Sequence, residues 1–260
     1  STSSSLANMR FTLDSRDEFY KGEREYYDEI GPLVMNYMSE YGKMMLESKF
    51  RKDLERKMNP VLFKMWEVAA LAHDPKIVEE EQKENAIVTE YNMLMSQMQF
   101  DYQGKKVPLS LVRGDLTNKD REVRKQAAES IGKGLQANAE KLDEIMDRLV
   151  KIRDLQAKKL GYKDFITLGY YRMGRIDYNR EMVADFKKNV LNSIVPIVKK
   201  MKEDLAKEMG IDKIMLYDNE VYSLTGNPRP KLDKEGIFKA AQEMYNEMNP
   251  EIGAFMKKMI

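Results

Sequence analysis

Two tyrosines and two arginines near the middle of the chain are the side chains best suited to hold a ligand. Tyr170, Tyr171, Arg172 and Arg175 lie within the stretch KKLGYKDFITLGYYRMGRIDYNREM. The two arginines are three residues apart and share a face if the segment is helical. Because a guanidinium fork suits carboxylates and carbonyls, these four residues are candidates for substrate binding, holding a peptide in a cleft. The alternative is a structural corner, in which the arginines form salt bridges and the tyrosines pack between helices.

Signals for the end of one helix and the start of the next flank this corner. Gly161 follows a lysine-rich turn, which is typical of a helix C-terminus. Asn179 can cap the following helix by accepting a hydrogen bond from the amide of Glu181 or Met182. The corner is therefore predicted to be fixed and not a flexible linker.

The sequence lacks the residue combinations of nucleophilic or metal-dependent catalysis. There is no cysteine, and the single histidine, His73, has no second histidine and no partner four residues away. We expect His73 to donate to a carbonyl or to lie in solvent at a helix end. Nucleophile–base arrangements and glycine-rich phosphate loops are also missing. We therefore assign no catalytic residue, no metal ligand and no cofactor to this chain.

An acidic run, Glu79 to Glu84, is the remaining candidate for a cation site. A calcium loop alternates its carboxylates around a glycine turn, whereas this run lies within a helical pattern. We expect it to form a solvated helix face.

The stretch LGYKDFITLGYYRMGRIDYNREMV resembles the oligoendopeptidase F group of the thimet-oligopeptidase-like zinc metallopeptidases. Three further pieces agree with that group in the same order, and together they span nearly the whole chain. They are SLANMRFTLDSRDEFY at the start, KDREVRKQAAESIGK at Lys119 to Lys133, and GNPRP at Gly226 to Pro230. The resemblance implies a two-lobed helical fold and, for the intact enzyme, zinc-dependent cleavage of short peptides inside a deep channel walled by helices. It also raises the expectation that the tyrosine–arginine corner lines that channel.

The zinc-binding H-E-x-x-H helix of this group is absent from the sequence. The chain is therefore expected to be the helical substrate-channel portion of such an enzyme, without an N-terminal segment and the catalytic C-terminal half, and to be inactive alone. The alternative is a stand-alone helical scaffold or peptide-binding module without catalysis. Whether the source reading frame continues past Ile260 into an H-E-x-x-H segment would separate the two.

Composition narrows the choice of partners. The net charge is +1 although 33% of residues are charged, which argues against nucleic acid, including RNA, and against a membrane surface. The expected partners are short peptides and either the missing catalytic half or a second copy of the chain. No apolar run approaches 18 residues and no signal-peptide pattern opens the chain, so we expect a cytoplasmic protein.

Periodicity predicts a mainly α protein, a multi-helix array with one small β-hairpin near residues 99–109. Helix should account for roughly 65–75% of residues, about twice the average of globular proteins. We divide the chain into an N-terminal helical region with the hairpin (1–117) and a helical region that carries the corner (118–260), together forming one continuous, truncated domain. The 20 methionines are expected mainly to fill the core.

Four local features carry further expectations. Gly31-Pro32 should end a first helical segment and begin another, and Pro196 should kink a long helix. The irregular stretch Gly210 to Lys231 is expected to contain a short strand at Ile214 to Tyr217. The final segment, Pro250 to Ile260, carries apolar side chains that nothing later in the chain can cover: Phe255, Met256, Met259 and Ile260.

Overall fold

The computed structural model describes residues 2–223 and 225–259 and confirms the mainly α prediction. Helix accounts for 76% of the chain, and one two-stranded sheet is present in the described part. The α-helices are α1 (Thr2–Leu13), α2 (Glu18–Leu46), α3 (Arg51–Lys57), α4 (Pro60–Ala72), α5 (Val78–Gln97), α6 (Leu109–Gly114), α7 (Arg121–Gln136), α8 (Ala139–Lys159), α9 (Phe165–Arg172), α10 (Arg180–Asn189), α11 (Val195–Glu208), α12 (Lys234–Met248) and α13 (Pro250–Met259).

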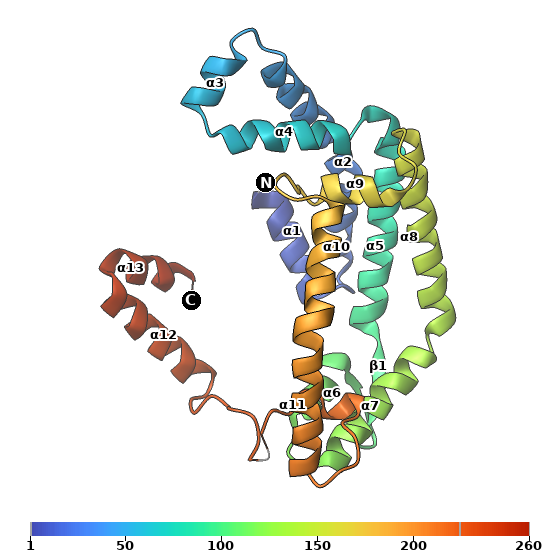
Figure 1. Ribbon diagram of the computed structural model, residues 1–260, viewed down its shortest axis with the longest axis vertical. Coiled ribbons are helices and arrows are strands. Elements are labelled where there is room, and N and C mark those ends of the chain that lie inside the picture. The colour runs from blue at the N-terminus through green and yellow to red at the C-terminus, as the bar shows by residue number, and fades with distance from the viewer. Residues whose placement is uncertain (1, 224, 260) are drawn as a thin grey trace.

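Helices α2, α5 and α8 form the body of the molecule (Figure 1). Helices α4 and α9 pack against each other across one end of this body, and the hairpin and α7 lie at the other end. The long helix α10–α11 runs between the two ends, whereas α12 and α13 pack against each other and stand apart. No helix in the described ranges is long and apolar enough to cross a membrane.

The predicted hairpin is present as β1 (Gln99–Tyr102) and β2 (Lys105–Pro108), paired antiparallel. Gln103 and Gly104 both have positive φ (50° and 74°), the conformation that a tight two-residue hairpin turn requires. Phe100 is fully buried and packs so close to α7 that a Cβ on Gly134 would lie 2.4 Å from its ring. Such a ribbon is only marginally stable alone, and this contact fixes it to the helices.

Helix α2 continues through Gly31-Pro32, so the predicted break at this point is wrong. Proline has no N–H and should leave the carbonyl of Asp28 without its helical donor. The side chain of Asn85 on α5 donates to that carbonyl at 3.0 Å, and Gln82 donates to the carbonyl of Glu29 at 2.8 Å. Because tertiary contacts satisfy both groups, a buried proline is tolerated within the helix.

The disturbance expected at Pro196 takes the form of a π-helical turn, η3 (Val190–Ile194), between α10 and α11. The strand expected at Ile214 to Tyr217 is absent from the described residues. The chain instead forms a 3₁₀ turn, η4 (Leu216–Asp218). The carboxylate of Asp218 accepts from the backbone N–H of Met215 at 2.9 Å, which closes the turn.

Most methionines are exposed, so the expectation that they mainly fill the core is wrong for this chain. Met98 belongs to the hairpin cluster with Phe100, Val112 and Ala127, but most of the others are between 44% and 67% exposed. At the C-terminal end Phe255 is 64% and Met259 is 67% exposed, while Met256 is partly buried. Ile260 lies outside the described residues.

Candidate functional site

The predicted corner consists of α9 and the turns on its two sides. Gly161 has φ of +89° and ends α8, where the N–H of Tyr162 donates to the carbonyl of Ala157 at 2.9 Å. Gly174 has φ of +62° and ends α9 in the same way, because the N–H of Arg175 donates to the carbonyl of Tyr170 at 3.3 Å. These are the bonds that a left-handed glycine permits at a helix C-terminus.

Side-chain caps begin the two helices of the corner. Asp164 accepts from the backbone N–H of Ile166 at 3.0 Å and begins α9. Asn179 accepts from the N–H of Met182 at 3.0 Å and begins α10, as the sequence predicted. Because each end of α9 is defined by specific hydrogen bonds, the side chains on this short helix have fixed directions.

Three of the four candidate residues line one hollow of about 620 Å³. They are Tyr170, Tyr171 and Arg175, and the hollow extends to the first turn of α10. The guanidinium of Arg175 lies 4.1 Å from the ring centre of Tyr170 and 5.4 Å from that of Tyr178. Sequence reasoning missed Tyr178, although it lies in the same stretch, three residues after Arg175.

Arg172 points to the other side of α9 and is engaged with the helix body. Its guanidinium donates to the buried carboxylate of Glu84 on α5 at 2.8 Å and to the side-chain carbonyl of Gln156 on α8 at 3.0 Å. Arg153 and Gln156 also donate to Glu84, at 2.7 and 2.9 Å. Arg153 and Arg172 both lie 5.7 Å from the ring centre of Phe165 and flank it. Arg172 therefore forms the structural salt bridge that was the alternative to ligand binding.

Glu84 shows that the acidic run is not a solvated face throughout. Burial raises the pKa of Glu84, but the hydrogen bonds from Arg172, Arg153 and Gln156 outweigh it and the pKa lies below its ordinary value. Glu80, one turn earlier, is also buried and pairs with Lys159 at 2.7 Å. Glu80 and Glu84 are four residues apart, which places both carboxylates on one side of α5. This spacing was the signal in the sequence that could have separated them from the solvated residues of the run.

His73 is buried at the end of α4, so the expectation that it lies in solvent is wrong, whereas the alternative, donation to a carbonyl, agrees with the side-chain carbonyl oxygen of Asn36 beside its ring. One ring nitrogen lies 2.6 Å from the side-chain oxygen of Asn36 and the other lies 3.1 Å from the carboxylate of Glu81. His73, Tyr171 and Arg172 line a second hollow of about 650 Å³, which shares Val68 and Tyr171 with the hollow that contains Arg175. His73 thus joins α2, α4 and α5 behind the corner.

A second buried ion-pair network, which sequence reasoning did not find, lies at the opposite end of the molecule. The carboxylate of Asp218, with no exposed surface, accepts from Arg124 at 2.8 Å and from Arg121 at 3.0 Å. Arg124 also donates to three backbone carbonyls. Burial raises the pKa of Asp218, but the arginines and the N–H of Met215 hold it below its ordinary value. This network attaches the irregular stretch after α11 to α7.

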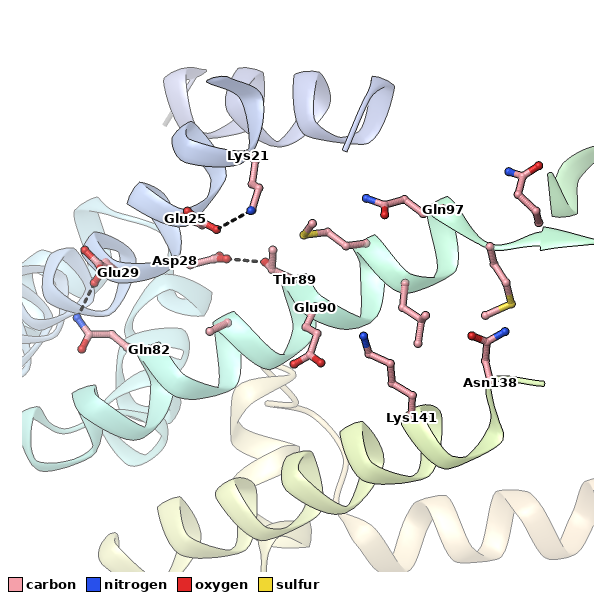
Figure 2. Close-up of a pocket in the computed structure, with 15 residues that line it drawn as sticks. Lys21, Glu25, Asp28, Glu29, Gln82, Thr89, Glu90, Gln97, Asn138 and Lys141 are labelled. Carbon is pink, nitrogen blue, oxygen red and sulfur yellow. Dashed lines mark hydrogen bonds and ion pairs between the residues drawn. The ribbon is translucent and has the colours of Figure 1, made fainter. Parts of the chain in front are cut away.

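A hollow of about 740 Å³ lies between α2, α5 and α8, away from the corner. Figure 2 shows the residues that line it. Much of its polar lining is satisfied within the wall. Thr89 donates to Asp28 at 2.5 Å, Lys21 lies 4.0 Å from Glu25, and Gln82 donates to a backbone carbonyl. Two of these pairs join α5 to α2 and the third lies within α2, which leaves the corner as the better candidate for a ligand site.

The described residues do not fit a catalytic metal. No group of three or more His, Cys, Asp and Glu side chains within the described ranges could hold an ion. We therefore assign no step of a metal-dependent reaction to the residues of this chain.

Solved structures with the same fold define the class of protein. The chain superimposes with a TM-score of 0.93 and 35% identity on a protein described as oligoendopeptidase F, and with 0.92 and 36% on another from Bacillus anthracis strain Ames. PZ peptidase A, solved with an inhibitor, gives 0.93 and 39%. Each likeness covers 98% of this chain but only 45–47% of the other, so the chain spans less than half the length of these relatives. The fold is that of a helical peptidase.

Family models agree with the solved structures. The model of the peptidase M3 N-terminal domain matches residues 1–72, and that of peptidase family M3 matches residues 116–246, half of the chain. The chain belongs to peptidase family M3 and, within it, is similar to oligoendopeptidase F. A search of curated proteins gave no significant match.

Proposed function

We propose that this chain is the helical substrate-channel portion of a zinc-dependent oligoendopeptidase that cleaves short peptides. In this proposal the chain is inactive alone and contributes a wall of the channel, with Tyr170, Tyr171 and Arg175 facing the peptide. Zinc, which the family implies for the intact enzyme, would be bound by residues outside this chain. Membership of peptidase family M3 supports the reaction class.

The observation that carries the proposal is an apolar surface without a partner. Helix α10 and the π-turn contain no buried residue, and neither does α12. Their exposed apolar side chains lie at helical spacing, as expected for a face that packs against another element. On α10–α11 they are Met182, Phe186, Leu191, Ile194, Ile197 and Met201, each 52–67% exposed.

The exposure of six large apolar side chains along one helix, each by more than half, argues for a partner. Contiguous apolar patches larger than a few hundred Å² are unusual on soluble monomers. Leaving about 400 Å² in water forgoes on the order of 10 kcal/mol at about 25 cal/mol per Å², which is comparable to the stability of a whole domain. The relatives contain more than half of their length outside the likeness, which is enough to cover these faces. We propose that this remaining part is the partner that covers the exposed faces. When it is absent, we expect two copies of the chain to associate through the same faces.

A complementation experiment tests the proposal. The 260-residue chain and the part of a matched relative outside the likeness would be produced separately and mixed with zinc and a quenched fluorescent peptide. We expect no cleavage by the chain alone and cleavage in the mixture. Sedimentation at low micromolar concentration should show the chain self-associating alone and forming a mixed complex with the added part.

The alternative is a stand-alone helical scaffold or peptide-binding module. It predicts a stable, compact monomer that does not bind the added part. That result would contradict the proposal that the exposed faces of α10–α11 and α12 belong to an interface.

A further inference from the structure

We propose that Arg175 is the ligand-binding arginine of the corner and that it binds a carboxylate group of a peptide. The inference rests on the proposed function only in taking the ligand to be a peptide. Nothing in the sequence distinguishes Arg175 from Arg172, because both follow the tyrosine pair on the same segment. Their surroundings in the fold are what separate them.

The guanidinium of Arg172 donates through Nη1 to groups within the protein, whereas that of Arg175 has no hydrogen bond to the described residues. Arg172 donates to Glu84 and to Gln156, both of which are buried. No ion pair or hydrogen bond to the guanidinium of Arg175 occurs among residues 2–223 and 225–259. An arginine that serves only the fold usually finds a carboxylate or a carbonyl, as Arg124 does with Asp218.

Aromatic stacking holds Arg175 in place without occupying its N–H groups. The guanidinium lies 4.1 Å from the ring centre of Tyr170 and 5.4 Å from that of Tyr178. Contacts with the faces of aromatic rings use no hydrogen-bond acceptor, so the N–H donors of Arg175 remain free for a ligand. Since Tyr170 is on α9 and Tyr178 precedes the Asn179 cap, the stacked side chain is held from two sides. This arrangement orients the fork before a ligand binds.

The hollow that contains Arg175 has the size and lining of a peptide site. Its volume of about 620 Å³ is within the range of ligand pockets. Val68, Ile166 and Met182 supply apolar surface beside the tyrosines. Such a surface suits the side chains of a short peptide while the fork binds a charged group.

The charges around the hollow favour a carboxylate over a more highly charged anion. Arg175 and Arg180 line it, but so do Asp177 and Glu181. Asp177 lies 3.9 Å from Lys64, which partly neutralises it. With two cations and two anions present, the hollow has no strong positive field to attract a phosphate dianion. Recognition must come from bidentate hydrogen bonding, and a planar carboxylate fits a guanidinium fork in this way.

Peptide binding to the 260-residue chain tests the assignment. Fluorescently labelled hexapeptides of neutral residues would be compared by anisotropy with a free C-terminal carboxylate and with a C-terminal amide. In a second pair both peptides are amidated at the C-terminus, and one carries an internal Glu where the other carries Gln. This pair distinguishes recognition of a side-chain carboxylate from recognition of the C-terminal carboxylate. We expect wild type to bind the form with the recognised carboxylate about tenfold tighter, the usual scale of one hydrogen bond to a charged group.

Variants of Arg175 test whether this residue causes the preference for a carboxylate. Arg175→Gln should bind all four peptides equally, and Arg175→Lys, which keeps the charge but not the fork, should retain only part of the preference. Arg56→Gln, on exposed α3, is the matched control and should behave as wild type. Circular dichroism and thermal unfolding would show whether each variant is folded. If Arg175→Gln does not fold, the carboxylate preference of Arg175→Lys tests the assignment instead.

Two results would overturn the inference, and they have different consequences for the proposed function. If peptides bind but carboxylate and amide forms bind equally to wild type, or if the preference survives in both Arg175 variants, Arg175 does not bind a carboxylate, and peptide binding stands. If no peptide binds in any form, the carboxylate site and the peptide-binding role of this chain both fail.

Discussion

Replacing Glu84 by glutamine should destabilise the fold at the point where α5, α8 and α9 meet. The carboxylate is 5% exposed and accepts hydrogen bonds from Arg153, Gln156 and Arg172. Glutamine keeps the shape but loses the charge, and its NH₂ group is a donor placed where other donors already converge. The three helices would then be joined by two arginines that lack their anion.

The expected magnitude follows from the burial of the partners. Removing one member of a buried ion pair usually costs about 3–5 kcal/mol. Arg153 and Arg172 keep 37% and 32% of their side-chain surface in solvent and can be hydrated once the carboxylate is gone. We therefore expect Glu84→Gln to lower the free energy of unfolding by about 2–3 kcal/mol at pH 7, below the usual cost of breaking a buried pair.

Urea unfolding followed by circular dichroism measures this loss, and pH supplies a second readout. The pKa of folded Glu84 lies below its ordinary value of 4.5, so the stabilisation is complete above about pH 4.5 and is lost as the pH falls through the folded pKa. The difference between wild type and variant should shrink over that acidic range. Glu79→Gln is the control, because Glu79 lies on the same helix in an exposed pair with Lys83, and it should leave stability almost unchanged. Equal effects of the two substitutions, or a difference that grows with acidity, would refute the reasoning.

Four further substitutions test other features of the fold by the same measurement. Asp218→Asn, which leaves two arginines without their buried carboxylate, should cost about 3 kcal/mol or more, and a loss below 1 kcal/mol would contradict that role. Asn85→Ala should cost about 1–3 kcal/mol, because a carbonyl freed by the helix-interior proline loses its donor; an unchanged stability would show that water replaces the amide. Gly134→Ala should destabilise by about 1–3 kcal/mol through a clash with Phe100, whereas Gly132→Ala, with open space around it, should stabilise by about 0.5–1 kcal/mol. The same sign for both alanines would contradict the close contact at the hairpin.

Local signals in the sequence were sufficient to place most helices and the hairpin. Asn179 and Asp233 cap α10 and α12, and Asn59 caps the helix that begins at Pro60, because each side chain is bonded to amides two or three residues away. Gly104 and Gly161 adopt positive φ at their turns for a reason that is equally local.

Predictions failed where a distant residue decided the outcome. Pro32 should end a helix by its own chemistry, yet side chains from α5 satisfy the carbonyls of the preceding turn. The strand expected at Ile214 to Tyr217 was wrong because Asp218 is bound by arginines about 95 positions earlier in the chain. No local pattern contains such contacts.

The candidate site also has a part that local sequence signals predicted and a part that depended on distant contacts. Residue types and short spacings were enough to predict the family resemblance, the helical class and the candidate set of Tyr170, Tyr171, Arg172 and Arg175. The different roles of the two arginines depend on the fold: Arg172 binds the buried Glu84, while Arg175 lies against Tyr170, unpaired among the described residues, in a hollow with the two tyrosines. The physical reason is that a charged side chain takes its role from the groups that surround it, and packing brings those groups from helices far apart in the sequence.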